Sequence, residues 1–153
     1  MKRFFLALTL LLCFAFPAQA DEQFKDYIFK ALPNYVIDSQ SRNFNQLEIK
    51  SPKTGNNDFD STTYEGNLVN TRYSYQGAAD SVPSQLQIFR NYQNAVKKLE
   101  GEILYDQGDG LHTSFLRNDK QYYMTVSAYN SGHIIEVKIL EVEEMEDELE
   151  IID

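Results

Sequence analysis

Two histidines are the side chains that titrate near neutral pH, and they are the first candidates for chemistry in this sequence. His112 follows a Gly-Asp-Gly turn and His133 follows Asn-Ser-Gly, so each begins a predicted strand and the two could share one rim. A zinc site needs a third ligand, and Asp109 is the acid that the sequence places nearby. Histidines at strand starts more commonly hydrogen-bond the preceding turn. We therefore expect no metal site and no cofactor.

Hydrolytic sites have weak support in the residue pattern. A serine hydrolase needs a nucleophile, a base and an oxyanion hole. The sequence contains no Gly-x-Ser-x-Gly, and Ser114 and Ser127 fall inside predicted strands. Glu65, Glu102 and Asp106 are acids that a glycosidase could pair, but acidic residues are too frequent here to point to a cleft. We expect no catalytic residue, and a small hydrolase acting on cell-wall material stays as an alternative.

Tyrosine is the informative side chain, because the sequence has 10 Tyr, 10 Phe and no Trp. In the strand predicted over 121–129, Tyr123 and Tyr129 lie on the side opposite Met124 and Val126. Tyrosines on the less apolar side of a sheet suit recognition of a peptide, glycan or protein. Ordinary packing between neighbouring strands is the alternative explanation. We take Tyr123 and Tyr129 as the candidate binding face.

The first twenty residues have the pattern of a secretory signal peptide. Lys2 and Arg3 precede an apolar run over 4–16, and Ala18-Gln19-Ala20 gives a small-x-small cleavage pattern before Asp21. The apolar run is shorter than the roughly 20 residues that span a bilayer. We expect cleavage between Ala20 and Asp21, export to the periplasm, and no membrane insertion of the mature chain.

Charge and length limit the classes of partner. The chain has 14 Lys+Arg and 23 Asp+Glu, a net charge of −9, and removing Lys2 and Arg3 leaves 12 against 23, or −11. Nucleic acids and anionic membranes need clustered basic residues, so neither is an expected partner. The single cysteine, Cys13, lies in the leader, so the mature chain has no disulfide. We expect one domain over 21–142 and an acidic C-terminal tail over 143–153.

The stretch 84–99 is the long periodic helix of the sequence. Its apolar positions recur every three or four residues, with Ser84 and Gln87 at capping-box spacing and Gly101 where a left-handed residue would end the helix. The predicted apolar stripe contains Leu86, Ile88, Phe89, Tyr92, Ala95, Val96 and Leu99.

The remaining pattern predicts strands that this helix covers. Phe24 to Leu32 has helical spacing and ends at Pro33, which predicts a short N-terminal helix, and 51–62 has loop composition. Strands are predicted over 64–75, 102–106, 112–117, 121–129 and 133–142, with a short strand candidate over 35–37, and 44–49 alternates with one face that is only weakly apolar. The expected fold class is α+β: an antiparallel β-sheet meander of about five to six strands with the main helix packed on one face.

Several short motifs together resemble a known family. They are Tyr64-Glu65-Gly66, the helix segment Ile-Phe-Arg-Asn-Tyr at 88–92 with Ala95, Gly101 to Leu104, the strand over 122–126, and Glu-Val-Glu-Glu-Met at 141–145. Their order resembles the N-terminal domain that precedes the OmpA-like domain in a group of exported OmpA-family proteins. The resemblance implies that the protein is located in the cell envelope and that it shares the fold of that domain. The peptidoglycan-binding activity of that group belongs to the OmpA-like domain, which would begin where this sequence stops at Asp153.

These observations together predict an exported, periplasmic, non-enzymatic module of the bacterial cell envelope. It would bind or position an envelope protein or a peptidoglycan component through its sheet face or through an exposed edge strand. Two alternatives remain beside it: the small periplasmic hydrolase, and an exported interaction or inhibitor domain whose acidic tail docks on a basic surface.

Overall fold

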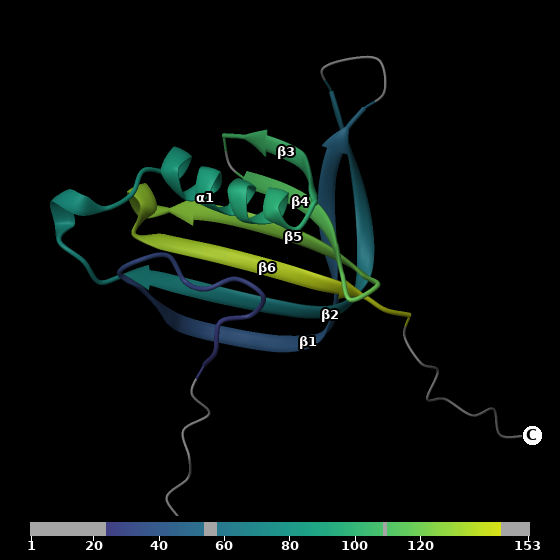
Figure 1. Ribbon diagram of the computed structural model, residues 1–153, viewed down its shortest axis with the longest axis horizontal. Helices are drawn as coiled ribbons and strands as arrows, with labels where there is room; N and C mark the ends of the chain where they lie inside the picture. The colour runs from purple at the N-terminus through teal and green to yellow at the C-terminus, as the bar shows by residue number, and fades with distance from the viewer. Residues whose placement is uncertain (1–23, 54–57, 109, 145–153) are drawn as a thin grey trace, which may run out of the picture.

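A six-stranded antiparallel sheet with one helix makes up the protein in the part that the computed structural model describes, which covers residues 24–53, 58–108 and 110–144 (Figure 1). The spatial order of the strands is β1-β2-β6-β5-β4-β3. The fold is therefore mostly β with a single helix, which confirms the predicted antiparallel sheet. The strands are β1 (Tyr35–Pro52), β2 (Phe59–Tyr75), β3 (Glu102–Gln107), β4 (Gly110–Arg117), β5 (Lys120–Tyr129) and β6 (Ile134–Val142).

The predicted leader, its cleavage site between Ala20 and Asp21, and most of the acidic tail lie outside the described residues. Within the described ranges, no helix combines the length and the apolar character needed to cross a bilayer.

Helix α1 (Gln85–Lys98) begins where the sequence predicts. Ser84 Oγ accepts a hydrogen bond from the Gln87 N–H at 3.3 Å, and Gln87 Oε1 accepts one from the Ser84 N–H at 2.8 Å. This reciprocal pair is the capping box, and it satisfies two donors that a helix start otherwise leaves unpaired. The predicted apolar stripe is wrong at Leu86, whose side chain is 60% exposed. The buried side chains of the helix are Ile88, Phe89, Tyr92 and Val96.

The end of α1 differs from the prediction in which residue is left-handed. Glu100 has φ +57° and its N–H bonds the Lys97 carbonyl, whereas the Gly101 N–H bonds the Val96 carbonyl. This pair of bonds is a Schellman motif with Glu100 at the left-handed position. Gly101 is required for another reason: a Cβ there would lie 2.7 Å from the carbonyl oxygen of Ser114.

The helix predicted over 24–32 is wrong. This segment has no regular secondary structure, and Ile28 has φ +64°, which no α-helix contains. Its apolar side chains pack on the core instead, and the Phe29 ring meets the rings of Tyr92 and Phe115 edge-on at centroid distances of 6.4 and 5.7 Å. Nearly consecutive side chains are partly buried, which an irregular segment allows and a one-sided helix does not.

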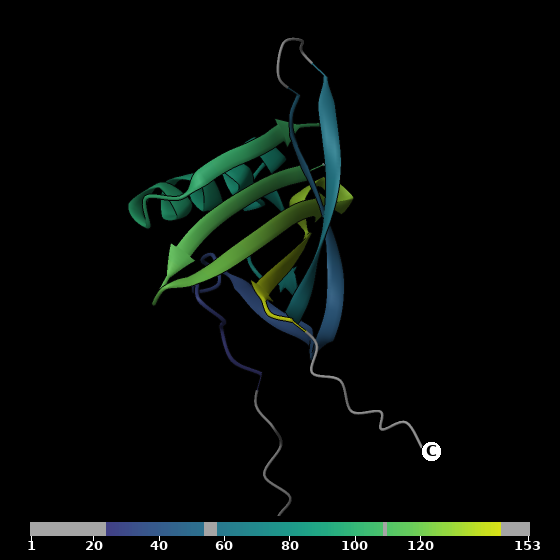
Figure 2. The ribbon, with the colours of Figure 1, turned by 90° about the vertical axis from the view of Figure 1, so that its right-hand side faces the viewer.

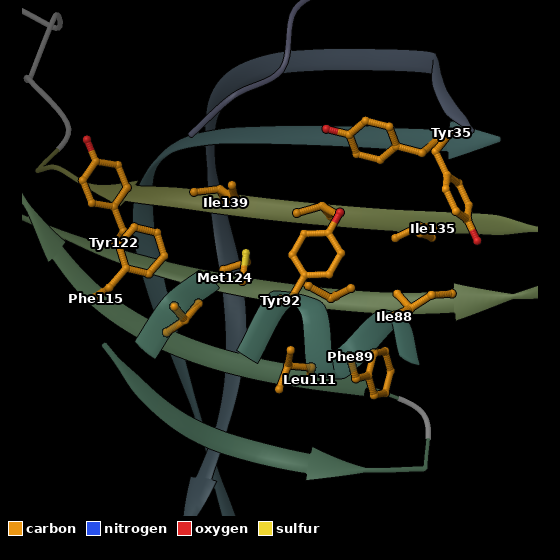
Figure 3. Close-up of a cluster of buried hydrophobic side chains, with 14 residues drawn as sticks. Tyr35, Ile88, Phe89, Tyr92, Leu111, Phe115, Tyr122, Met124, Ile135 and Ile139 are labelled. Carbon is orange, nitrogen blue, oxygen red and sulfur yellow. The ribbon is translucent and has the colours of Figure 1, made fainter. Parts of the chain in front are cut away.

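The main core lies between the sheet and the cover formed by α1 and residues 24–34 (Figures 1 and 3). We call this side of the sheet the helix face. The inward alternation predicted for β5 and β6 is confirmed, since Met124, Val126, Ile135, Val137 and Ile139 are all buried there.

The opposite side, the back face, has a second and smaller core. In the region of β1 the sequence predicts a short strand over 35–37 and a weakly alternating stretch over 44–49, but β1 is one strand of 18 residues that pairs with β2 over its length apart from a register shift at 37–39. The far end of this hairpin bends toward the back face (Figure 2), and β1 contacts β3, β4 and β5. The residues of the back-face core are Leu47, Ile49, Leu68 and Leu140, with Tyr64, Leu104 and Tyr123 packed against them.

Gly66 stands where β2 leaves its pairing with β6. It has φ +156° and lies opposite Val142, the last residue of β6. A Cβ at this position would overlap the carbonyl oxygen of Glu141. Glycine therefore lets β2 pass β6 closely and turn toward the back face.

Candidate binding surface on the back face of the sheet

The back face carries one row of side chains that crosses four strands near the start of β6. The register pairs Val36 with Ser74, Ser74 with Ile134, and Ile134 with Tyr129. Directly paired residues point to the same side of a sheet, so these four side chains form one line, which we call the back-face row. Val36 is 49% exposed and Tyr129 is 48% exposed, so the row presents apolar surface at both ends.

A band of charged side chains runs beside this row. Arg72 pairs with Glu136 across β2 and β6, and Arg72 Nε lies 3.5 Å from Asp38 Oδ2. Lys138 Nζ lies 3.6 Å from Glu136 Oε1, which also accepts a hydrogen bond from Asn70 Nδ2 at 3.1 Å. The back-face row and this charged band (Asp38, Arg72, Glu136 and Lys138) together give an apolar line bordered by charge, which is typical of protein-binding surfaces.

The structure separates the two tyrosines that the sequence placed on one binding face. Both lie on the back face, but Tyr123 belongs to the back-face core, where its ring stacks on that of Tyr64 at 3.8 Å and 17°. Tyr129 lies six residues along the strand, about 20 Å away, and its hydroxyl is 3.4 Å from Glu136 Oε2. Tyr129 therefore belongs to the back-face row, whereas Tyr123 is a packing residue.

The two histidines lie in different surroundings. His112 Nδ1 accepts a hydrogen bond from the Lys50 N–H at 3.0 Å, and its ring meets the Tyr105 ring edge-on at 5.2 Å. His133 Nδ1 is 2.8 Å from the Asn130 carbonyl, and its ring meets the Tyr75 ring edge-on at 6.3 Å. Asp109 lies outside the described residues. The residues that the structure does describe contain no group of three or more metal ligands.

One polar network joins the ends of β5 and β6. Lys120 forms an ion pair with Glu141, and Glu141 Oε2 accepts a hydrogen bond from the Tyr122 hydroxyl at 2.6 Å. Figure 3 shows this hydroxyl pointing out of the apolar cluster. The bond from Lys120, together with that from Tyr122, lowers the pKa of Glu141. Burial raises the pKa of Tyr122, and its bond to Glu141 adds to the effect. Each polar group here is held by its neighbours, which indicates a structural role.

Burial also raises the pKa of the tyrosines inside the main core. Tyr92, on α1, is surrounded by apolar side chains, and burial is the main reason why its pKa is raised. Burial likewise raises the pKa of Tyr73, whose hydroxyl is 3.4 Å from Asp26 Oδ1. These phenols stay protonated at neutral pH and contribute to packing.

A shallow hollow of about 360 Å³ lies between the end of α1 and strands β3, β4 and β5. Glu102 and Ser114 line it, together with Glu100 and Gln121, but Glu65 and Asp106 do not. Asp106 accepts a hydrogen bond from Gln93 Nε2 on α1. The acids that the sequence offered as a carboxylate pair therefore do not meet in this hollow.

No family model matches the chain, and no curated protein matches it. The resemblance to the domain that precedes the OmpA-like domain stays a prediction. The sequence does predict Ile134, Glu136 and Lys138 on the outer side of β6. It does not predict that Val36 and Tyr129 end the same row, because this depends on β6 lying between β2 and β5.

Proposed function

We propose that this protein is an exported, non-enzymatic binding module of the bacterial cell envelope, and that the back-face row is its contact surface. The observation that carries the proposal is the line from Val36 to Tyr129, which presents apolar side chains beside a charged band. An aromatic residue with a hydroxyl, bordered by charges that fix orientation, suits recognition of a protein or of a peptidoglycan component.

Export is supported by the leader pattern of residues 1–20. Expression of the full chain in a bacterium should give a periplasmic product whose first residue is Asp21, and mass spectrometry measures this directly. A product that keeps Lys2 and Arg3 in the cytoplasmic fraction would contradict the export part of the proposal.

The contact surface is tested by capture from envelope extract and by co-sedimentation with peptidoglycan sacculi. The variant carries Val36→Ser and Tyr129→Ser, which remove the two exposed ends of the row and leave both cores intact. We expect one component of the envelope to be retained in proportion to the amount of wild-type protein. The variant should bind this component at least about tenfold more weakly, as for the loss of a central contact in an interface.

Leu86→Ser is the matched control, because Leu86 is a large apolar side chain, 60% exposed, on α1 and away from the back face. Equal retention by all three proteins would contradict the role of the row. Release of soluble fragments from sacculi by the wild type would contradict the non-enzymatic part and favour the cell-wall hydrolase.

A further inference from the structure

Strand β4 continues past the start of β3, so part of its outer edge has no neighbouring strand. The pairing of β3 with β4 begins at Glu102 and Ser114, whereas β4 runs on to Arg117. The β4–β5 turn has two residues with φ of +51° and +62°, which makes Arg117 and Lys120 the hydrogen-bonded pair that closes it. Main-chain direction alternates along an antiparallel strand, so the N–H and C=O groups of Leu116 point away from β5. Among the residues that the structure describes, none forms a hydrogen bond with either group.

The hollow at the end of α1 lies beside this open edge, and Figure 1 shows α1 ending next to the start of β3. Its volume of about 360 Å³ is within the roughly 300–1,000 Å³ that ligand pockets have. The apolar part of its lining comes from Leu99, Phe115 and Leu116. Leu116 is 65% exposed, so the hollow presents an apolar side chain together with the unpaired main-chain groups of the same residue.

The charged side chains of the hollow are both acidic. Glu100 and Glu102 line it, and no basic side chain does. No other residue in the described ranges forms an ion pair or a side-chain hydrogen bond with either carboxylate. Lys97 and Lys98, in the last turn of α1, are exposed and do not line the hollow. The lining of the hollow therefore carries negative charge without a positive partner.

Gln121 gives the hollow a further hydrogen-bond acceptor. Its Nε2 donates to the carbonyl oxygens of Phe115 and Tyr122 at 3.3 and 2.9 Å, which uses both N–H groups of the amide and leaves Oε1 as an acceptor. A ligand that matches this lining has an apolar stem and a cationic head with several N–H donors. Arginine is the side chain with this chemistry.

We propose that this hollow binds an arginine side chain on an extended segment of a partner protein. The segment pairs with the N–H and C=O groups of Leu116 as a short addition to the edge of β4, and the guanidinium group donates to Glu100 and Glu102. The site is separate from the back-face row, because Gln121 and Tyr129 lie near opposite ends of β5, about 27 Å apart along the strand. The inference therefore goes beyond the proposed function and does not depend on the row.

The test is an NMR titration of the purified protein, as cells produce it, with the blocked peptide acetyl-Ala-Thr-Arg-Thr-Ala-amide. We expect saturable binding with a Kd on the order of 1 mM, and a downfield shift of the Leu116 N–H resonance because this group gains a hydrogen bond. A second peptide carries citrulline, a neutral analogue of the same length, in place of arginine. It should bind at least about fivefold more weakly, because its bonds to the carboxylates lose their charge. Binding of the arginine peptide should also weaken as the salt concentration rises from about 0.05 to 0.5 M.

The double variant Glu100→Gln/Glu102→Gln removes both charges with little change in side-chain size, and it should bind the arginine peptide at least about tenfold more weakly. The matched control Glu48→Gln/Asp80→Asn removes two exposed acids outside the hollow and should bind like the wild type. Circular dichroism confirms that both are folded. Absence of a saturable shift at Leu116, equal affinities for the two peptides, or equal affinities of the two double variants would overturn the proposal. Shifts confined to the back-face row would also overturn it, and would support the proposed function instead.

Discussion

Tyr123 and Tyr129 lie on the same strand, but their surroundings differ. We therefore expect substitutions at the two positions to change the free energy of unfolding by different amounts. The Tyr123 ring is stacked on Tyr64 inside the back-face core, whereas Tyr129 is 48% exposed. Tyr123→Ala removes packed aromatic atoms and leaves a cavity, so we expect it to lower the free energy of unfolding by about 3 kcal/mol. Tyr129→Ala should change it by no more than about 0.5 kcal/mol. Urea unfolding measures both, and equal losses would contradict the assignment.

Two buried threonines differ in whether their hydroxyl has a partner. Thr113 is fully buried and its Oγ1 has no hydrogen-bond partner among the described residues, whereas Thr71 Oγ1 accepts a bond from Gln40 Nε2 at 2.9 Å. Thr113→Val keeps the shape and removes an unsatisfied polar atom, so it should stabilise the fold by about 1 kcal/mol. Thr71→Val breaks an existing bond and should destabilise by a similar amount. Thermal unfolding gives both signs, and a destabilised Thr113→Val would contradict the prediction.

Glu141 gives the fold an acid-sensitive contribution. Its bond with Lys120, then that with Tyr122, lowers its pKa in the folded state. Because the pKa of Glu141 is lower in the folded state, its ionised carboxylate stabilises the fold fully at a pH above the unfolded pKa of about 4.5. This stabilisation disappears as the pH falls through the folded pKa. Glu141→Gln should therefore be less stable by about 1 kcal/mol at pH 7, and its stability should meet that of the wild type at low pH.

Urea unfolding of both proteins between about pH 7 and pH 3 checks this convergence. Lys120→Gln, which keeps the carboxyl group and removes the ammonium group, should show the same convergence in part. If the free energies of unfolding of the wild type and Glu141→Gln keep the same difference down to the lowest pH, this would contradict the role of the ion pair.

At the level of the elements, α1 is set by signals within its own sequence. The capping box is formed by neighbouring residues, which explains why the sequence predicts the start of the helix correctly. The segment 24–32 was predicted wrongly for the opposite reason, since its apolar spacing fits a helix but its conformation depends on Tyr92 and Phe115.

The candidate surface, like that segment, depends on contacts between distant parts of the chain, so the sequence predicts it only in part. Alternation predicts which side chains of β5 and β6 share a side. It does not predict the strand order that lines up Val36 with Tyr129, or the bend of the hairpin that covers Tyr123.

The cap of α1 can be tested by one substitution. Ser84→Ala removes the oxygen that accepts the Gln87 N–H, and it should lower the free energy of unfolding by about 1 kcal/mol. Ser84→Asp keeps an acceptor and should retain most of the stability. Chemical unfolding of the two variants makes the comparison, and equal losses would show that the cap is not what Ser84 contributes.

On the scale of the whole molecule, the path of the β1–β2 hairpin depends on one glycine. A Cβ at Gly66 would overlap the Glu141 carbonyl oxygen, so Gly66→Ala forces β2 and β6 apart. We expect a loss of about 3 kcal/mol. Hydrogen exchange should also show a less protected Lys50 N–H, because its bond to His112 depends on the bend. Unchanged exchange at Lys50 would show that the hairpin does not need this close approach.

The last strand along the chain lies in the middle of the sheet. β6 pairs with β2 on one side and with β5 on the other, so nothing joins the β1–β2 hairpin to the β3–β5 meander through the sheet until β6 has been made. Folding can therefore be completed only late in synthesis. If the proposed export takes place on the unfolded polypeptide, this order would keep the sheet incomplete before transport and leave its assembly to the far side of the membrane.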